Sequence, residues 1–172
     1  SLLMLGMPAS WILAMHQGVR PDTIMHVFWL SPLLILVLSW LLLHERTHWL
    51  LWAATGLAFC GAYLLHEPGP LDLPRVLTFP LAMALCFSLY VVMTRSLRNE
   101  QVHANLFYTA LGVFLALTPA MPWVWVTPAP VDALLMAGIG VLGGFALWML
   151  DRAAAAAPVS ASAPFAYLQL AA

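Results

Sequence analysis

Polar and aromatic side chains that could bind a small molecule occur at helical spacing in a strongly apolar sequence. Asp22, His26 and Trp29 are separated by four and three residues, so they share one face of a helix. A histidine at this position could bind a carboxylate or exchange a proton, because imidazole titrates near neutral pH. The tryptophan could stack on a substrate. The alternatives are an interfacial His26 paired with Asp22 and a Trp29 that only packs.

Three further aromatic residues are candidates for a substrate site. Tyr90 lies one helical turn before Thr94. Trp148 shares a helix face with Asp151, and Tyr167 falls in the last apolar stretch. Packing is the alternative for each of them.

Two prolines inside apolar stretches are candidate hinges, Pro32 and Pro164. A proline removes one backbone donor and disturbs the preceding helical turn. In lipid, the freed backbone groups need new partners or a water-lined cavity. A structural kink without a role in function is the alternative.

Catalytic and metal-binding patterns are lacking in this sequence. Cys60 and Cys86 lie in apolar runs without metal-ligand spacing, and we interpret them as small core residues. Ser88 has no glycine neighbour, which argues against an intramembrane serine protease. No ionisable residue falls in the middle of a complete predicted span, so we expect no buried carboxylate for a proton-driven mechanism. No cofactor is predicted. Glu45 and Arg46 are interpreted as an anchor at a span end, and Arg95 and Arg98 as determinants of topology rather than substrate ligands.

The composition indicates that the surface faces lipid. The 172 residues are 63% hydrophobic and only 8% charged, with a mean hydropathy of +0.93, whereas soluble domains carry roughly 25% charged residues. The net charge of −1 does not indicate a basic surface that would bind nucleic acid. We therefore expect an all-α, polytopic membrane helix bundle whose partner is the lipid bilayer.

Five complete membrane spans and two partial ones are predicted from apolar runs of suitable length. Charged or helix-breaking residues separate them, including DRAAAAAP at 151–158. The complete spans are 24–43, 49–65, 77–94, 106–126 and 133–150, and the partial ones are 1–15 and 160–172.

The arginines predict the orientation of these spans. Loops alternate between the two sides of the membrane, and one side carries four of the six arginines. The positive-inside rule places that side in the cytoplasm. The four are Arg46, Arg95, Arg98 and Arg152, and the other two are Arg20 and Arg75.

The two ends of the sequence resemble each other. A shift from position 6 to position 143 aligns Gly with Gly, and the same shift aligns Trp11 with Trp148 and Pro21 with Pro158. Five predicted spans separate each residue from its copy, so the copy enters the membrane from the opposite face. This is an inverted repeat, as in many secondary transporters. The repeat predicts ten spans in all, with the chain truncated at both ends and unable to transport alone.

Three stretches resemble the drug/metabolite transporter superfamily, in its ten-helix EamA-type branch. They are SPLLILVLSWLLLHER (31–46), SLYVVMTRSLR (88–98) and APFAYLQL (163–170). The resemblance implies two inverted five-helix repeats. Residues 1–66 would be helices 3–5, residues 67–76 the inter-repeat loop, and residues 77–172 helices 6–9, the last incomplete. One departure is His44, where many relatives have Gly before the Glu that closes helix 4.

The resemblance also implies a function. Relatives are secondary transporters that move small metabolites by alternating access, so we expect a substrate such as an amino acid, vitamin or nucleobase and a bacterial inner membrane location. In the family, the helices that hold His26, Trp29, Tyr90, Trp148 and Tyr167 line the path. The alternatives are a non-transporting membrane scaffold or subunit and an intramembrane enzyme. The oligomeric state stays open.

Overall fold

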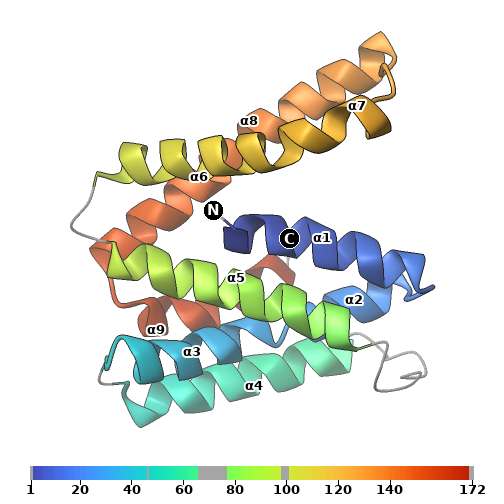
Figure 1. Ribbon diagram of the computed structural model, residues 1–172. Coiled ribbons are helices and arrows are strands. Elements are labelled where there is room, and N and C mark those ends of the chain that lie inside the picture. The colour runs from blue at the N-terminus through green and yellow to red at the C-terminus, as the bar shows by residue number, and fades with distance from the viewer. Residues whose placement is uncertain (1, 46, 66–76, 98–100, 171–172) are drawn as a thin grey trace.

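The chain folds into a bundle of apolar helices, and the computed structural model describes residues 2–45, 47–65, 77–97 and 101–170 (Figure 1). These residues contain no strand, which confirms the predicted all-α membrane bundle. The elements in chain order are α1 (Leu2–His16), α2 (Pro21–Phe28), α3 (Ser31–Leu42), α4 (Trp49–Leu65), α5 (Thr78–Ser96), α6 (Val102–Leu117), the 3₁₀ helix η1 (Thr118–Ala120), α7 (Met121–Val124), α8 (Pro130–Ala156), α9 (Val159–Ser162) and the 3₁₀ helix η2 (Ala163–Leu170).

Three helical segments among the described residues are long and apolar enough to cross a membrane, namely Pro21–Leu42, Thr78–Ser96 and Pro130–Ala156. The helices Leu3–His16, Trp49–Gly61 and Val102–Leu117 are apolar but shorter. The predicted loop at 67–76 lies outside the described residues, as do Arg46, Arg75 and Arg98.

The predicted span 24–43 is two helices separated by a turn. The turn lies at Trp29 and Leu30, between α2 and α3. Pro32 explains its position, because proline has no N–H to donate to the carbonyl one turn earlier, that of Phe28. At the same turn, the carbonyl of Trp29 accepts a hydrogen bond of 2.8 Å from the Tyr167 hydroxyl.

The prediction of one span over 106–126 was wrong at both ends. Helix α6 begins at Val102 and ends at Leu117, and η1 and α7 follow as short turns. Pro119 and Pro122 lack the N–H groups that a continuous helix requires. The hydroxyl of Thr118 caps the end of α6 by donating to the Phe114 carbonyl at 2.7 Å.

The predicted break at 151–158 was wrong for most of its length. Helix α8 continues through Ala156, because alanine is the best helix former and four alanines follow Arg152 within it. The helix ends only at Ala157, which is extended (φ −140°, ψ 158°) and precedes Pro158. Asp151 therefore lies inside a helix and not in a loop.

The core surrounds α5, which packs against α1, α2, α3 and α8 (Figure 1). Tyr90, Val91 and Val92 of α5 are buried with Ile35 of α3 and Ala154 of α8. The Ser88 hydroxyl donates to the Ser31 carbonyl at 3.1 Å and to the Ala84 carbonyl at 2.7 Å, so one of these interactions ties α5 to α3. Helix α8 contrasts with this core, because its first sixteen residues are all exposed.

The two helix boundaries that the sequence repeat aligns have the same backbone conformation, an extended residue followed by a proline. Arg20 is extended and precedes Pro21 between α1 and α2, and Ala157 is extended and precedes Pro158 between α8 and α9. Under the sequence shift these positions are equivalent. The inverted repeat itself stays a prediction.

Candidate functional site

A cluster of polar side chains is buried where α5, α6 and α8 meet. Asn105 of α6 donates from Nδ2 to Asp151 Oδ2 at 2.8 Å. The hydroxyl of Tyr90 faces Asp151, Thr94 and Thr109. Asp151 is 2% exposed and Tyr90 is 5% exposed. We call these five residues the polar cluster.

The polar cluster is not internally satisfied. The Tyr90 hydroxyl oxygen and Asp151 Oδ1 are both buried, and neither makes a hydrogen bond of good geometry. The two side chains lie close enough to each other to interact electrostatically. Buried polar atoms in native proteins almost always have partners. The cluster therefore has the chemistry of a site that accepts a further group.

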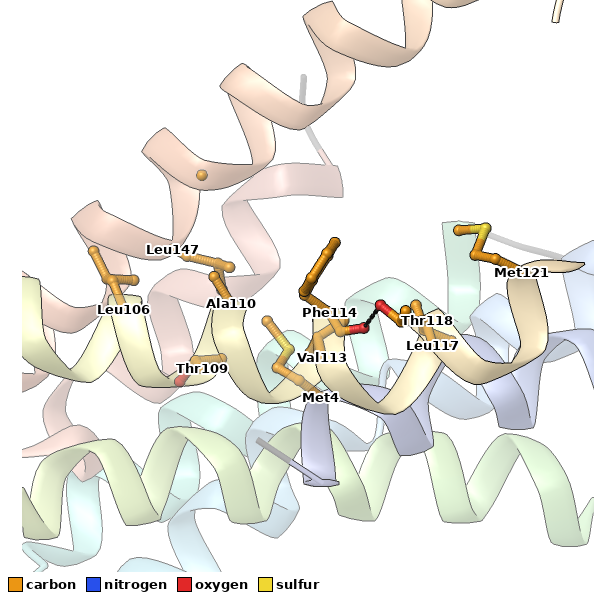
Figure 2. Close-up of a pocket in the computed structure, with 11 residues that line it drawn as sticks. Met4, Leu106, Thr109, Ala110, Val113, Phe114, Leu117, Thr118, Met121 and Leu147 are labelled. Atoms are coloured by element: carbon orange, nitrogen blue, oxygen red, sulfur yellow. Dashed lines mark hydrogen bonds between the residues drawn. The ribbon is translucent and has the colours of Figure 1, made fainter. Parts of the chain in front are cut away.

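A cavity of about 660 Å³ adjoins the polar cluster at Thr109, which belongs to both. Figure 2 shows its wall, formed by one side of α6 from Leu106 onward with Met4 of α1 and Leu147 of α8. The lining residues are Met4, Leu106, Thr109, Ala110, Val113, Phe114, Leu117, Thr118, Met121, Gly144 and Leu147. An apolar cavity of this size with a few polar groups is typical of a small-molecule site.

An ion pair closes the bundle at the break between α8 and α9. Arg95 Nε lies 3.3 Å from Glu45 Oε1, and Arg95 Nη1 donates to the carbonyls of Ala154 and Ala155 at 2.7 and 3.1 Å. Glu45 Oε2 accepts from the Ser160 hydroxyl at 3.0 Å. A cation at the carbonyl end of a helix is favourable, because the last carbonyls lack helical partners. The pairing of Glu45 with Arg95 was not predicted from the sequence.

The backbone turn at His44 directs Glu45 into this ion pair. His44 has φ 52°, in the left-handed region, directly after the C-cap of α3. Glycine is favoured there because it has no Cβ. This gives a physical reason for the Gly that the family resemblance leads one to expect at the position.

The structure brings together two of the predicted site residues, Trp29 and Tyr167. Their rings stack with centroids 6.2 Å apart, and both side chains are buried. Tyr167 also donates to the Trp29 carbonyl at the turn between α2 and α3. Pro32 is buried beside this turn, and Pro164 begins the 3₁₀ helix that carries Tyr167. Neither aromatic ring lines the cavity.

The other predicted residues lie apart from this pair. His26 Nδ1 is 2.6 Å from the backbone carbonyl of Asp22, whereas the Asp22 carboxylate pairs with Arg20 at 2.8 Å. His26 thus contacts the backbone of Asp22, and the interpretation of an interfacial His26 paired with Asp22 stays a prediction. Trp148 is half-buried. The guanidinium carbon of Arg152 lies over its ring, 5.3 Å from the ring centroid.

Asp151 is the residue that sequence reasoning missed. It was expected on a helix face with Trp148, at the edge of the span 133–150 and next to the predicted break, so the expectation of no buried carboxylate was wrong. A signal was present, since the alanines after Arg152 favour continuation of the helix. Of the predicted residues, only Tyr90 belongs to the polar cluster. No group of three His, Cys, Asp or Glu side chains able to hold a metal occurs among the described residues.

The comparisons with known proteins find transporters. Residues 1–66 match the EamA-like transporter family. The chain is 30% identical over 171 residues to a protein named S-adenosylmethionine uptake transporter from Rickettsia bellii (strain RML369-C), covering 98% of this chain and 58% of that relative. It is 29% identical over 140 residues to the protein of the same name from Rickettsia prowazekii (strain Madrid E). This match covers 81% of this chain and 48% of that relative.

A second kind of transporter is also similar. The chain is 29% identical over 150 residues to a protein named riboflavin transporter from Vibrio cholerae serotype O1, covering 81% of this chain and 48% of that relative. The chain thus spans about half the length of the curated relatives it matches. No solved structure shows a significant match.

Proposed function

Over residues 1–66 the chain belongs to the EamA-like transporter family, and from this membership we propose that its protein is a secondary transporter of a small metabolite. The protein works by alternating access in a bacterial inner membrane. The observation that carries the proposal is the apolar cavity that ends at the buried, incompletely bonded polar cluster.

The order of features along the bundle supports a transport path. The cavity extends from Met121 of α7 along α6 to Leu106, and Thr109 connects it to the polar cluster. Beyond the cluster, Arg95 and Glu45 hold α3, α5 and the α8–α9 break together. Alternating access requires that a path close at one end at a time, and the ion pair is the contact that could close this one. A membrane scaffold without transport activity would need no polar group inside its helices.

In this proposal, the region around the contact between Trp29 and Tyr167 acts as a hinge during the transport cycle. It joins α2 of the first predicted repeat to η2 of the second, beside Pro32 and Pro164. Each proline weakens the local helix, so the two segments can change their angle without breaking a full helical turn. His26 lies in α2 about one turn before Trp29, and the proposal puts it at the border of the path. The proposal also puts Trp148 of α8 at that border.

The relatives suggest which substrates to test first. S-adenosylmethionine is the first candidate and riboflavin the second, because proteins with these activities in their names are the matched relatives. The protein that contains this chain is expressed at full length in cells that lack their own uptake system. Saturable uptake of one labelled compound, absent in cells with the empty vector, is the expected result.

A wider panel of amino acids, vitamins and nucleobases follows if neither compound is taken up. The Tyr167→Phe variant serves as the structural probe, because it removes only the hydroxyl that bonds the Trp29 carbonyl. We expect slower uptake at unchanged membrane expression. Absence of uptake and export for the entire panel, with correct insertion of the protein, would overturn the proposed function.

A further inference from the structure

Asp151 combines deep burial with a position inside the bundle. It lies five residues before the last residue of α8, Ala156, which corresponds to about 8 Å along the helix. Its side chain faces α5 and α6, where Tyr90 and Asn105 contact it. Intramembrane carboxylates are costly and usually functional.

No positive charge among the described residues neutralises this carboxylate. On α5, Arg95 is engaged by Glu45 and by the carbonyls of Ala154 and Ala155. On α8 itself, Arg152 lies over the Trp148 ring. The groups that face Asp151 from α5 and α6 are the neutral Tyr90 and Asn105. A buried carboxylate without a cation is destabilising, so a positive charge must be supplied from elsewhere.

One proton would satisfy the free atoms of the polar cluster. Asp151 Oδ2 already accepts from Asn105, whereas Oδ1 is buried without a donor. A proton taken from water in the cavity would form an O–H bond at Oδ1 and leave the carboxyl group neutral. That O–H can donate to the oxygen of Tyr90, which also lacks a well-aligned partner. The tyrosine hydrogen is then available to Thr94 or Thr109, which face it.

From this geometry we propose that Asp151 is a proton-binding residue that couples proton movement to transport. Thr109 gives the route, because it lines the cavity and faces the Tyr90 hydroxyl. The proton enters from the cavity, resides on Asp151 while the carboxyl group is closed off, and leaves when the group is exposed again. The coupling rests on the proposed function, whereas the proton site itself does not.

Infrared spectroscopy tests the proton site without any substrate. The full-length protein is reconstituted in lipid and titrated from acid to alkaline pH while the carbonyl-stretch band of protonated, desolvated carboxyl groups is followed. We expect one reversible band that disappears in Asp151→Asn and shifts in frequency in Asp151→Glu. The matched control is Asp132→Asn, at the exposed start of the same helix, which should leave the band unchanged. A wild-type spectrum without such a band, or a band that persists in Asp151→Asn, overturns the proposal.

Uptake driven by a pH gradient tests the coupling. In proteoliposomes that transport their substrate, an imposed gradient should accelerate uptake severalfold for wild type and for Asp132→Asn. For Asp151→Asn the ratio of rates with and without the gradient should fall to about 1. An unchanged ratio in Asp151→Asn overturns the coupling and leaves the transport function standing. If no transport is found but the infrared band titrates, the proposed function fails and the proton site stands.

Discussion

Arg95 and Glu45 form a nearly buried ion pair that also holds the ends of two helices. Arg95 Nε lies 3.3 Å from Glu45 Oε1, and the two side chains are only 10% and 15% exposed. Arg95 bonds the last carbonyls of α8, and Glu45 bonds Ser160 at the start of α9. The pair thus joins α3, α5 and the α8–α9 break, and it connects the two predicted repeats.

Removal of one partner should therefore destabilise the bundle strongly. We expect Arg95→Met to lower the stability by about 3 kcal/mol, because it leaves Glu45 buried without a cation. Thermal unfolding in detergent measures the change. The matched control is Arg20→Met, which breaks the exposed Arg20–Asp22 pair at the equivalent break, where exposed pairs contribute at most about 1 kcal/mol. Equal losses in the two variants would contradict a structural role for the buried pair.

The backbone at His44 predicts a stabilising substitution. His44→Gly should raise the stability by about 1 kcal/mol, because the left-handed conformation is strained for a residue with a Cβ. The reverse test is Gly18→Ala, since Gly18 has φ 78° and a Cβ added there would have no atom within 4 Å. That variant should lose stability through backbone strain alone. A rise in the melting temperature of Gly18→Ala, or a fall in His44→Gly, would contradict these conformations.

The contact between α1 and α5 depends on Gly6. A Cβ at this position would lie 2.7 Å from Cys86 Sγ, so Gly6→Ala should cost about 1 kcal/mol through overpacking. In a Cys86→Ala background the same change should become neutral or stabilising, because the obstacle is gone and alanine favours a helix. A double-mutant cycle on thermal stability measures this reversal of sign. Gly56→Ala on α4, with no atom within 4 Å, is the control.

Filling the cavity should reduce transport without unfolding the protein. Gly144 lines the cavity, and no atom lies within 4 Å of a Cβ placed there. We expect Gly144→Leu to lower the uptake rate about tenfold or more at normal expression, because the new side chain occupies substrate space. Gly138→Leu on the exposed part of α8 controls for the helical effect of replacing glycine. Equal uptake by the two variants would place the substrate elsewhere.

The arginine distribution predicts which end of α8 lies in the cytoplasm. With Cys60 and Cys86 replaced, a cysteine at Ala153 should resist an impermeant thiol reagent added to intact cells. A cysteine at Val131, at the other end of α8, should react with it. Both positions are exposed in the structure, so burial within the described chain does not account for a difference. The opposite labelling pattern would invert the predicted orientation.

The sequence alone determined the class of this protein and much of its helical framework. An apolar composition with few charges leaves lipid as the solvent for most of the surface, and helices satisfy their own backbone hydrogen bonds there. The starts of α4 and α5 were predicted within one residue, because charged and helix-breaking loops precede them. Pro32 likewise indicated where the span 24–43 changes direction, since the missing N–H is a local property of the chain.

Only the tertiary structure decided which polar residues meet. Asp151, Asn105 and Tyr90 are far apart in the sequence, and no spacing rule joins residues from three helices. The same is true of Glu45, Arg95 and Ser160, whose partners are set by how the helices pack. Helical periodicity assigns a residue to a face, but the neighbour of that face depends on long-range packing. The burial of Asp151, and with it the candidate proton site, followed from that packing and from the continuation of α8 through its alanines.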